Sequence, residues 1–272
     1  MPAWLWLKYD AGDTKGSLMQ MEPIRRVARI SMRSHNLHLV TREPPCSRCN
    51  AEPFCLLTNF HDEQMKLFKK ELRVRGPFKR GETIYREGSS FTSIYCIQRG
   101  SVKTEVCTIS GVLEVTAFYL SGELFGVDGI GCETYPSDAV ALEDTWVCEL
   151  PFTQIKSMCS ACDEFHQMLI QHLGRTINSD VYQWALARNL KAKQKVAWFI
   201  YDLYKRVGVR SDAHQPMIPL PMRKTDIANY LGLAPESLSR ALNALEDDGM
   251  IVNKTKDIYL LDLQQAKAMS II

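Results

Sequence analysis

The chain has 272 residues, of which 46% are hydrophobic and 24% are charged, and its formal net charge is +2. This composition excludes a disordered or collagen-like protein, and the chain is long enough to bury one or two ordinary cores. No apolar run approaches the roughly 18–20 residues that a membrane-spanning helix needs, so we expect a cytoplasmic protein without a membrane anchor. Charge is unevenly distributed: residues 1–45 carry +3, residues 46–187 carry −5 and residues 188–272 carry +4.

Residues 1–45 show little regular periodicity, and we expect them to form a disordered N-terminal tail. The stretch that follows, "CSRCNAEPFC", places Cys46, Cys49 and Cys55 at C-x2-C-x5-C spacing. Nine cysteines in a cytoplasmic chain favour metal or redox chemistry over disulfides. Three thiols this close together predict a metal site that takes a fourth ligand from elsewhere.

Residues 76–150 are predicted to form β structure. Short runs rich in Val, Ile, Tyr, Phe and Thr alternate with glycine-containing turns every 8–12 residues or so, which is typical of an antiparallel sandwich or barrel. Residues 59–75 before them are expected to form a short amphipathic helix. We assign residues 46–162 to one domain that combines the cysteine loop with this β structure. Three cysteines in the β-rich stretches are expected to be small buried hydrophobes: Cys96, Cys107 and Cys132.

A long helix is predicted after the β structure, because residues 163–187 contain no proline and a single glycine. We assign residues 163–190 to a dimerisation helix. Spacings of 3, 4, 3 and 4 join the members of its predicted coiled-coil seam: Ile170, Leu173, Ile177, Asp180 and Trp184. In a parallel dimer Asp180 would face its own copy, and two buried like charges weaken association. The alternative is a helix that packs on its own β domain.

Residues 191–272 are predicted to form a winged helix-turn-helix. A helix over 191–206 and a loop over 208–221 precede two helices joined at Gly232, and a small hairpin follows. Pro235 suits the first position of the second helix, where its missing N–H is not needed. The buried faces of the two helices are expected to consist of Ile227, Ala228, Leu231, Leu233, Leu238, Ala241, Leu242 and Leu245.

The exposed face of the second helix would then hold Glu236, Ser239 and Arg240. Arg can bond O6 and N7 of guanine, Glu can accept from N4 of cytosine, and Ser is adaptable, so these side chains can read bases. The alternative is an ordinary solvated face on a helical hairpin. Three basic side chains are expected to contact phosphate and set the position of the domain on DNA: Lys224, Lys254 and Lys256.

Residues from about 46 to 265 resemble the Crp/Fnr superfamily of bacterial transcription regulators, and within it the oxygen-sensing FNR branch. "GELFGVDGIG" and "ALEDTWVCELPF" are similar to the sensor β-roll, and "IANYLGLAPESLSRALNALEDDGMI" is similar to the helix-turn-helix. The resemblance implies an α+β fold: an N-terminal cyclic-nucleotide-binding-like antiparallel β-roll (jelly roll), a long dimerisation helix and a C-terminal winged helix-turn-helix.

The same resemblance implies a mechanism. It supplies Cys148 as the fourth ligand of a [4Fe–4S] cluster, and the glutamate, serine and arginine signature implies palindromic TTGAT-type half-sites. With the cluster intact the protein would bind DNA as a homodimer and control anaerobic gene expression as an activator. Oxygen would convert the cluster and separate the dimer. Exposed β-roll loops such as "TISGVLE" would contact RNA polymerase.

Cyclic nucleotide is not expected as a ligand. Family members that bind one have a glycine-glutamate stretch, followed by an arginine that neutralises the phosphate. Gly122 and Glu123 are present here, but the later stretch "YPSDAVALE" carries Asp138 and no arginine. A buried phosphate would therefore lack its cationic partner.

The cysteines and histidines also bear on other kinds of protein. On the same scaffold, a zinc-bound or thiol-based redox regulator stays open, because the pairs Cys46/Cys49 and Cys159/Cys162 offer four thiolates. A cupin-type enzyme is not expected, since none of the six histidines lies within residues 76–150. A scaffold protein without either activity would leave the cysteine loop and the polar helix face unexplained.

Overall fold

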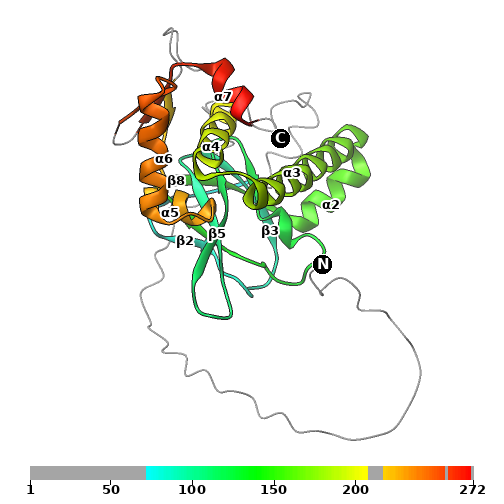
Figure 1. Ribbon diagram of the computed structural model, residues 1–272. Helices are drawn as coiled ribbons and strands as arrows, with labels where there is room; N and C mark the ends of the chain where they lie inside the picture. Colours follow the sequence, from blue (N-terminus) through cyan, green and yellow to red (C-terminus); the bar gives the residue numbers. More distant parts are fainter. Residues whose placement is uncertain (1–71, 208–216, 255–256, 271–272) are drawn as a thin grey trace, which may run out of the picture. The chain divides into compact units, whose positions relative to one another are not determined.

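The computed structural model describes residues 72–207, 217–254 and 257–270, and the structure is reported for these residues. Two four-stranded antiparallel sheets, in the orders β1-β8-β3-β6 and β2-β7-β4-β5, make up the first part (Figure 1). Their strands are β1 Arg73–Phe78, β2 Thr83–Tyr85, β3 Ser93–Arg99, β4 Val102–Cys107, β5 Leu113–Tyr119, β6 Leu124–Phe125, β7 Asp138–Ala141 and β8 Thr145–Pro151. A short 3-10 helix, Val127–Gly129, follows β6. The predicted antiparallel β-roll is confirmed.

Aromatic rings fill the space between the two sheets. Tyr85 of β2 stacks on Tyr135 with 3.9 Å between ring centroids and on Tyr95 of β3 with 5.6 Å. Phe125 of β6 lies 5.3 Å from the Tyr95 ring. All four residues are buried in one core cluster, to which strands of both sheets contribute. Stacked aromatic side chains bury a large apolar area each and therefore hold the two sheets together.

Helices α2 Phe152–Ala161 and α3 Asp163–Asn189 follow the last strand. They pack on the first sheet through a second cluster, in which Ile155 of α2 and Phe165 of α3 are buried. The long helix matches its prediction, whereas α2 was not predicted. Cys162 separates the two helices, because its extended backbone (φ −145°) interrupts the helical conformation.

The C-terminal part forms the predicted winged helix-turn-helix. Its elements are α4 Ala192–Val207, β9 Met217–Pro219, α5 Lys224–Tyr230, α6 Pro235–Asp247, β10 Ile251–Asn253, β11 Asp257–Leu260 and α7 Leu263–Ser270. Gly232 has φ +61°, a left-handed conformation that glycine adopts without strain, and it turns the chain between α5 and α6. The expected inward faces of α5 and α6 are buried, and Leu233 is half-buried against the same core.

Two local predictions were wrong. Residues 73–75, the end of the expected amphipathic helix, belong to β1, and residues 59–71 lie outside the described part. The expected loop over 208–221 contains strand β9, which pairs with β11 at the edge of the wing. Proline normally argues against a strand, but Pro219 is tolerated because an edge strand can leave one backbone position without a ladder hydrogen bond. The predicted tail, residues 1–45, lies outside the described residues.

Candidate DNA-binding and sensor sites

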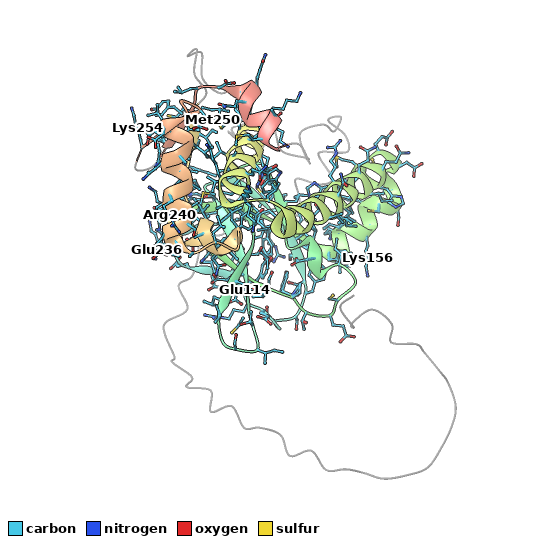
Figure 2. The ribbon with its side chains drawn as sticks, in the orientation of Figure 1. Glu114, Lys156, Glu236, Arg240, Met250 and Lys254 are labelled. Atoms are coloured by element: carbon cyan, nitrogen blue, oxygen red, sulfur yellow. The ribbon has the colours of Figure 1, made fainter. Side chains whose placement is uncertain are left out.

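Helix α6 presents a polar face to solvent. Leu238, Ala241 and Leu245 recur at helical spacing on its buried side, so Glu236 and Arg240 are turned outward (Figure 2). The three predicted base-reading residues, Glu236, Ser239 and Arg240, are all exposed. The Arg240 guanidinium donates a weak hydrogen bond to the Ser237 hydroxyl at 3.3 Å. These side chains are therefore available to a ligand that approaches α6.

Basic side chains lie at both ends of this face. Lys224 is the first residue of α5 and is exposed, and Lys254 is exposed between β10 and β11. The Lys254 ammonium lies 4.7 Å from the ring centroid of Tyr259, a cation–π contact that holds it on the wing. Lys256 lies outside the described residues. Lys224 and Lys254 are therefore accessible to solvent, and their phosphate contacts stay a prediction.

Cys148 lies in β8, the central strand between β1 and β3. Its register partners are Val74 on one side and Cys96 on the other. It is buried in the cluster that α2 and α3 cover. Val74, which pairs with Cys148, follows Cys55 by 19 residues in the sequence. The other predicted ligands, Cys46, Cys49 and Cys55, lie outside the described residues.

The remaining cysteines divide into two groups. Cys96 is buried, as expected, but Cys107 and Cys132 are exposed, so that part of the prediction was wrong. Cys107 is the last residue of β4 and Cys132 follows a tight turn, and strand ends and turns leave the sheet interior. Cys162 is buried in the same cluster as Cys148, and its thiol donates to Glu164 Oε2 at 3.2 Å. Burial raises the pKa of the half-buried Cys159.

Among the described residues, no group of three or more His, Cys, Asp or Glu side chains could hold a metal ion. A metal centre at Cys148 therefore needs donors from another part of the chain. A thiolate donor surrounded by apolar side chains is also shielded from water, which suits a cluster ligand.

Glu123, in the turn before β6, is held by an arginine of α4. Arg206, near the end of α4, donates from Nε to Glu123 Oε1 at 2.8 Å and from a terminal nitrogen to Oε2 at 2.6 Å. The same guanidinium bonds the Phe118 carbonyl and Asp202. Burial by itself would lower the pKa of Arg206, but Glu123 and Asp202 outweigh it and raise that pKa.

Sequence reasoning missed Arg206. A signal was present: Val196, Phe199 and Leu203 mark the buried stripe of α4, and Arg206 follows Leu203 by three residues on the same face. A charged residue at such a position predicts a buried partner of opposite charge.

Asp138, in the stretch that lacks the phosphate-binding arginine, accepts a hydrogen bond from the Glu87 backbone N–H at 2.6 Å. It therefore belongs to the β-roll framework.

Helix α3 exposes an apolar stripe. Ile170, Ile177 and Val181 are 55%, 64% and 59% exposed and lie on one face at spacings of seven and four. Leu173 is half-buried and packs instead against the helix's own β-roll cluster. Val181 was not among the predicted seam residues. Asp180 and Trp184 belong to α3, but their side chains lie outside the described part.

In the described part of the chain, no helix is long and apolar enough to cross a bilayer.

Two family models match the chain. Residues 75–162 match the cyclic nucleotide-binding domain, and residues 194–268 match the Crp-like helix-turn-helix domain. The transcriptional activator protein Anr of Pseudomonas aeruginosa is 32% identical over 217 residues, which cover 80% of this chain and 88% of that protein. The chain belongs to the Crp/Fnr family of transcription regulators. It is a DNA-binding regulator and not an enzyme.

Other Crp/Fnr proteins are similar to this chain in sequence or in fold. The fumarate and nitrate reduction regulatory protein of Escherichia coli is 30% identical over 215 residues, 79% of this chain and 86% of that protein. Among solved structures, FixK2 from Bradyrhizobium japonicum superposes with a TM-score of 0.67 at 23% identity, over 74% of this chain and 98% of FixK2. A CooA mutant from Carboxydothermus hydrogenoformans gives 0.64 at 17% identity, over 80% and 95%. The predicted fold class and family are confirmed.

Proposed function

We propose that this Crp/Fnr protein is a cytoplasmic, oxygen- or redox-responsive regulator that binds palindromic TTGAT-type sites as a homodimer when a [4Fe–4S] cluster is intact. It would control anaerobic gene expression. The observation that carries the proposal is the buried position of Cys148 beside β1, the first described strand after three cysteines that lie close together in the sequence. The similarity to regulators named Anr and fumarate and nitrate reduction regulatory protein supports it.

Four thiolates would hold the cluster: Cys46, Cys49, Cys55 and Cys148. When bound, the cluster would supply an oxygen-sensitive group on the sensor domain. Cys148 contributes a donor that β1 and β3 fix on both sides, and the surrounding apolar side chains exclude water. Residues 46–162 would form this sensor domain, preceded by a disordered tail over residues 1–45.

Residues 163–190 would form the dimerisation helix. Ile170, Ile177 and Val181 present the exposed apolar face that a second copy of α3 can cover. Asp180, next to Val181, would oppose association through like-charge repulsion, so the dimer would be weak until the sensor domain offsets that charge. Trp184 would extend this seam, whereas Leu173 packs against the β-roll cluster of its own chain.

Residues 191–272 would read DNA. Glu236, Ser239 and Arg240 on α6 would contact base edges in the major groove. Lys224, Lys254 and Lys256 would contact phosphates. Two such domains in a dimer would read two half-sites, and RNA polymerase would contact the exposed hairpin around Ile109, between β4 and β5.

A zinc-bound or thiol-based redox regulator is the second candidate, because Cys162 shares the cluster of Cys148 and lies three residues after Cys159. An ultraviolet–visible spectrum of anaerobically purified protein, with iron and zinc analysis, separates the two. Broad absorbance that changes on exposure to air, together with iron, is expected for the iron–sulfur protein. A colourless protein with bound zinc would instead support the second candidate.

A further inference from the structure

Helix α5 packs against two different parts of the protein. It contacts α6 within the helix-turn-helix, and it also contacts β5 of the β-roll (Figure 1). Three residues of α5, α4 and β4 make polar contacts across this boundary, and we call them the clasp: Lys103, Arg206 and Asn229.

Lys103 of β4 reaches the N-terminal end of α5. Its ammonium lies 2.9 Å from Asp226 Oδ1 and 2.7 Å from Glu105 Oε2. These three side chains are only 15%, 17% and 11% exposed. Burial would lower the pKa of Lys103, but its two carboxylate partners outweigh burial and raise that pKa. The second Asp226 oxygen accepts from the Arg223 backbone N–H at 3.3 Å, so Lys103 is tied to the cap of the helix that begins with the exposed Lys224.

The Asn229 side chain forms two hydrogen bonds with the backbone of β5. β5 is the last strand of its sheet, so among the strands that the structure describes none pairs with its other edge. The Asn229 carboxamide oxygen accepts from the Val115 N–H at 2.6 Å, and its amide nitrogen donates to the Leu113 carbonyl at 3.0 Å. This pair of bonds reproduces what a further strand would make, and it fixes the far end of α5 to β5.

Apolar side chains also pack across the boundary between the β-roll and the helix-turn-helix. Phe118 of β5 lies 5.0 Å from the Tyr230 ring and 6.0 Å from the Phe199 ring. Val115 and Phe118 belong to the same core cluster as the buried residues of α4, α5 and α6. Interfaces between domains are usually small, polar and mobile, and a continuous apolar core with buried ion pairs prevents such motion.

The clasp leaves the DNA-reading face open. Its contacts lie on the side of α5 that faces the β-roll, whereas Lys224, Glu236 and Arg240 are exposed. The clasp therefore cannot block DNA. Its contacts instead fix the orientation of α6 relative to the β-roll.

We infer that Lys103 and Asn229 are positioning residues for DNA recognition, which clasp the helix-turn-helix to the β-roll so that a dimer accepts one separation between half-sites. The inference rests on the proposed function, because it needs two copies on a palindrome. Two recognition helices that are held rigidly fit half-sites at a single spacing, since half-site separation follows dimer geometry. If the two helix-turn-helix domains move freely relative to their β-rolls, the second half-site is bound at a lower effective concentration and over a range of spacings.

The test uses the double variant Lys103→Met/Asn229→Leu, which keeps side-chain size and removes the Lys103 charge and the strand-like bonds of Asn229, while Arg206 is left unchanged. The probes are TTGAT palindromes whose half-sites are moved apart or together one base pair at a time, and a duplex with one half-site. Affinities are measured anaerobically by fluorescence anisotropy at fixed salt. Lys79→Met is the matched control, because Lys79 makes a 2.6 Å ion pair with Asp144 that is exposed and lies within the β-roll.

The wild-type protein and Lys79→Met are expected to prefer one spacing. The double variant is expected to lose that preference by about tenfold or more, while its affinity for the single half-site stays within about twofold. Lys103→Arg, which keeps the charge, should retain most of the preference. A double variant that keeps the full preference, or that loses single-site affinity equally, would overturn the inference alone. A wild-type protein without any spacing preference would overturn the proposed dimeric function as well.

Discussion

Arg206 and Glu123 form a bidentate ion pair between α4 and the turn before β6, although 83 residues separate them in the chain. The side chains of this pair are 23% and 26% exposed, so the pair lies at the margin of the core and not deep within it.

Arg206→Met should therefore destabilise the protein, because Glu123 would remain half-buried without its cationic partner. We expect a loss on the order of 2–3 kcal/mol in the free energy of unfolding, below the full cost of breaking a buried pair because some solvent reaches it. Urea unfolding measures the change. Lys79→Met, which breaks an exposed pair, should cost less than about 1 kcal/mol. Equal losses in the two variants would contradict this assignment.

Cys148→Ser should remove iron from the protein. Serine oxygen is a poorer ligand than thiolate for iron, so the visible absorbance and iron content of anaerobically purified protein should fall together. Cys96→Ser is the matched control, since Cys96 is also buried and is the register partner of Cys148 on β3. Normal iron content in Cys148→Ser, or equal loss in Cys96→Ser, would exclude Cys148 as a specific ligand.

Asp180→Ala should strengthen the dimer in air. Removal of the like charges that the seam brings together is expected to lower the dimer dissociation constant by about tenfold or more. Sedimentation velocity and DNA binding in aerated buffer report the change. Asp163→Ala removes an equal charge from the exposed first turn of α3 and should leave the dimer constant unchanged. An Asp180→Ala protein that stays monomeric without a cluster is incompatible with the repulsion model.

Arg240→Ala should lose sequence discrimination while it keeps the cluster. Loss of a bidentate contact to a base is worth about 1–3 kcal/mol of discrimination, measured as the ratio of affinities for TTGAT and altered sites. Lys254→Ala should weaken binding to both sites equally and reduce the salt dependence by about one ion. If Arg240→Ala weakened all sequences equally, Arg240 would be a phosphate contact.

His172 predicts a pH dependence of stability. Burial lowers its pKa from the ordinary value of 6.5, Arg175 lowers it further and Glu123 partly opposes them. The unfolded chain therefore binds the proton more readily, so the free energy of unfolding should fall as pH drops below about 6.5. His172→Gln, which cannot be protonated, should show a shallower fall between about pH 7.5 and 5.5 in urea titrations. Parallel curves for the two proteins would show that His172 does not contribute.

The sequence by itself determined the fold and the faces of the helices. The spacing of Leu238, Ala241 and Leu245 separates a buried from an exposed side of α6, and Gly232 marks the turn, because helical period and left-handed backbone are local properties. Short signals were less informative: β9 has three residues and includes a proline, and α2 lacks a strong start signal.

Only the tertiary structure decided which partner each buried face meets. Lys103 and Asp226 are 123 residues apart, and Asn229 lies 114 residues after the strand edge that it completes. The sequence predicts buried thiols at Cys107 and Cys132, but both are exposed, because they lie at a strand end and after a turn. Helical periodicity in the sequence predicts that one face of a helix is buried, and a charged residue on that face predicts a partner of opposite charge. Which residue becomes the partner depends on packing between segments that are distant in the sequence.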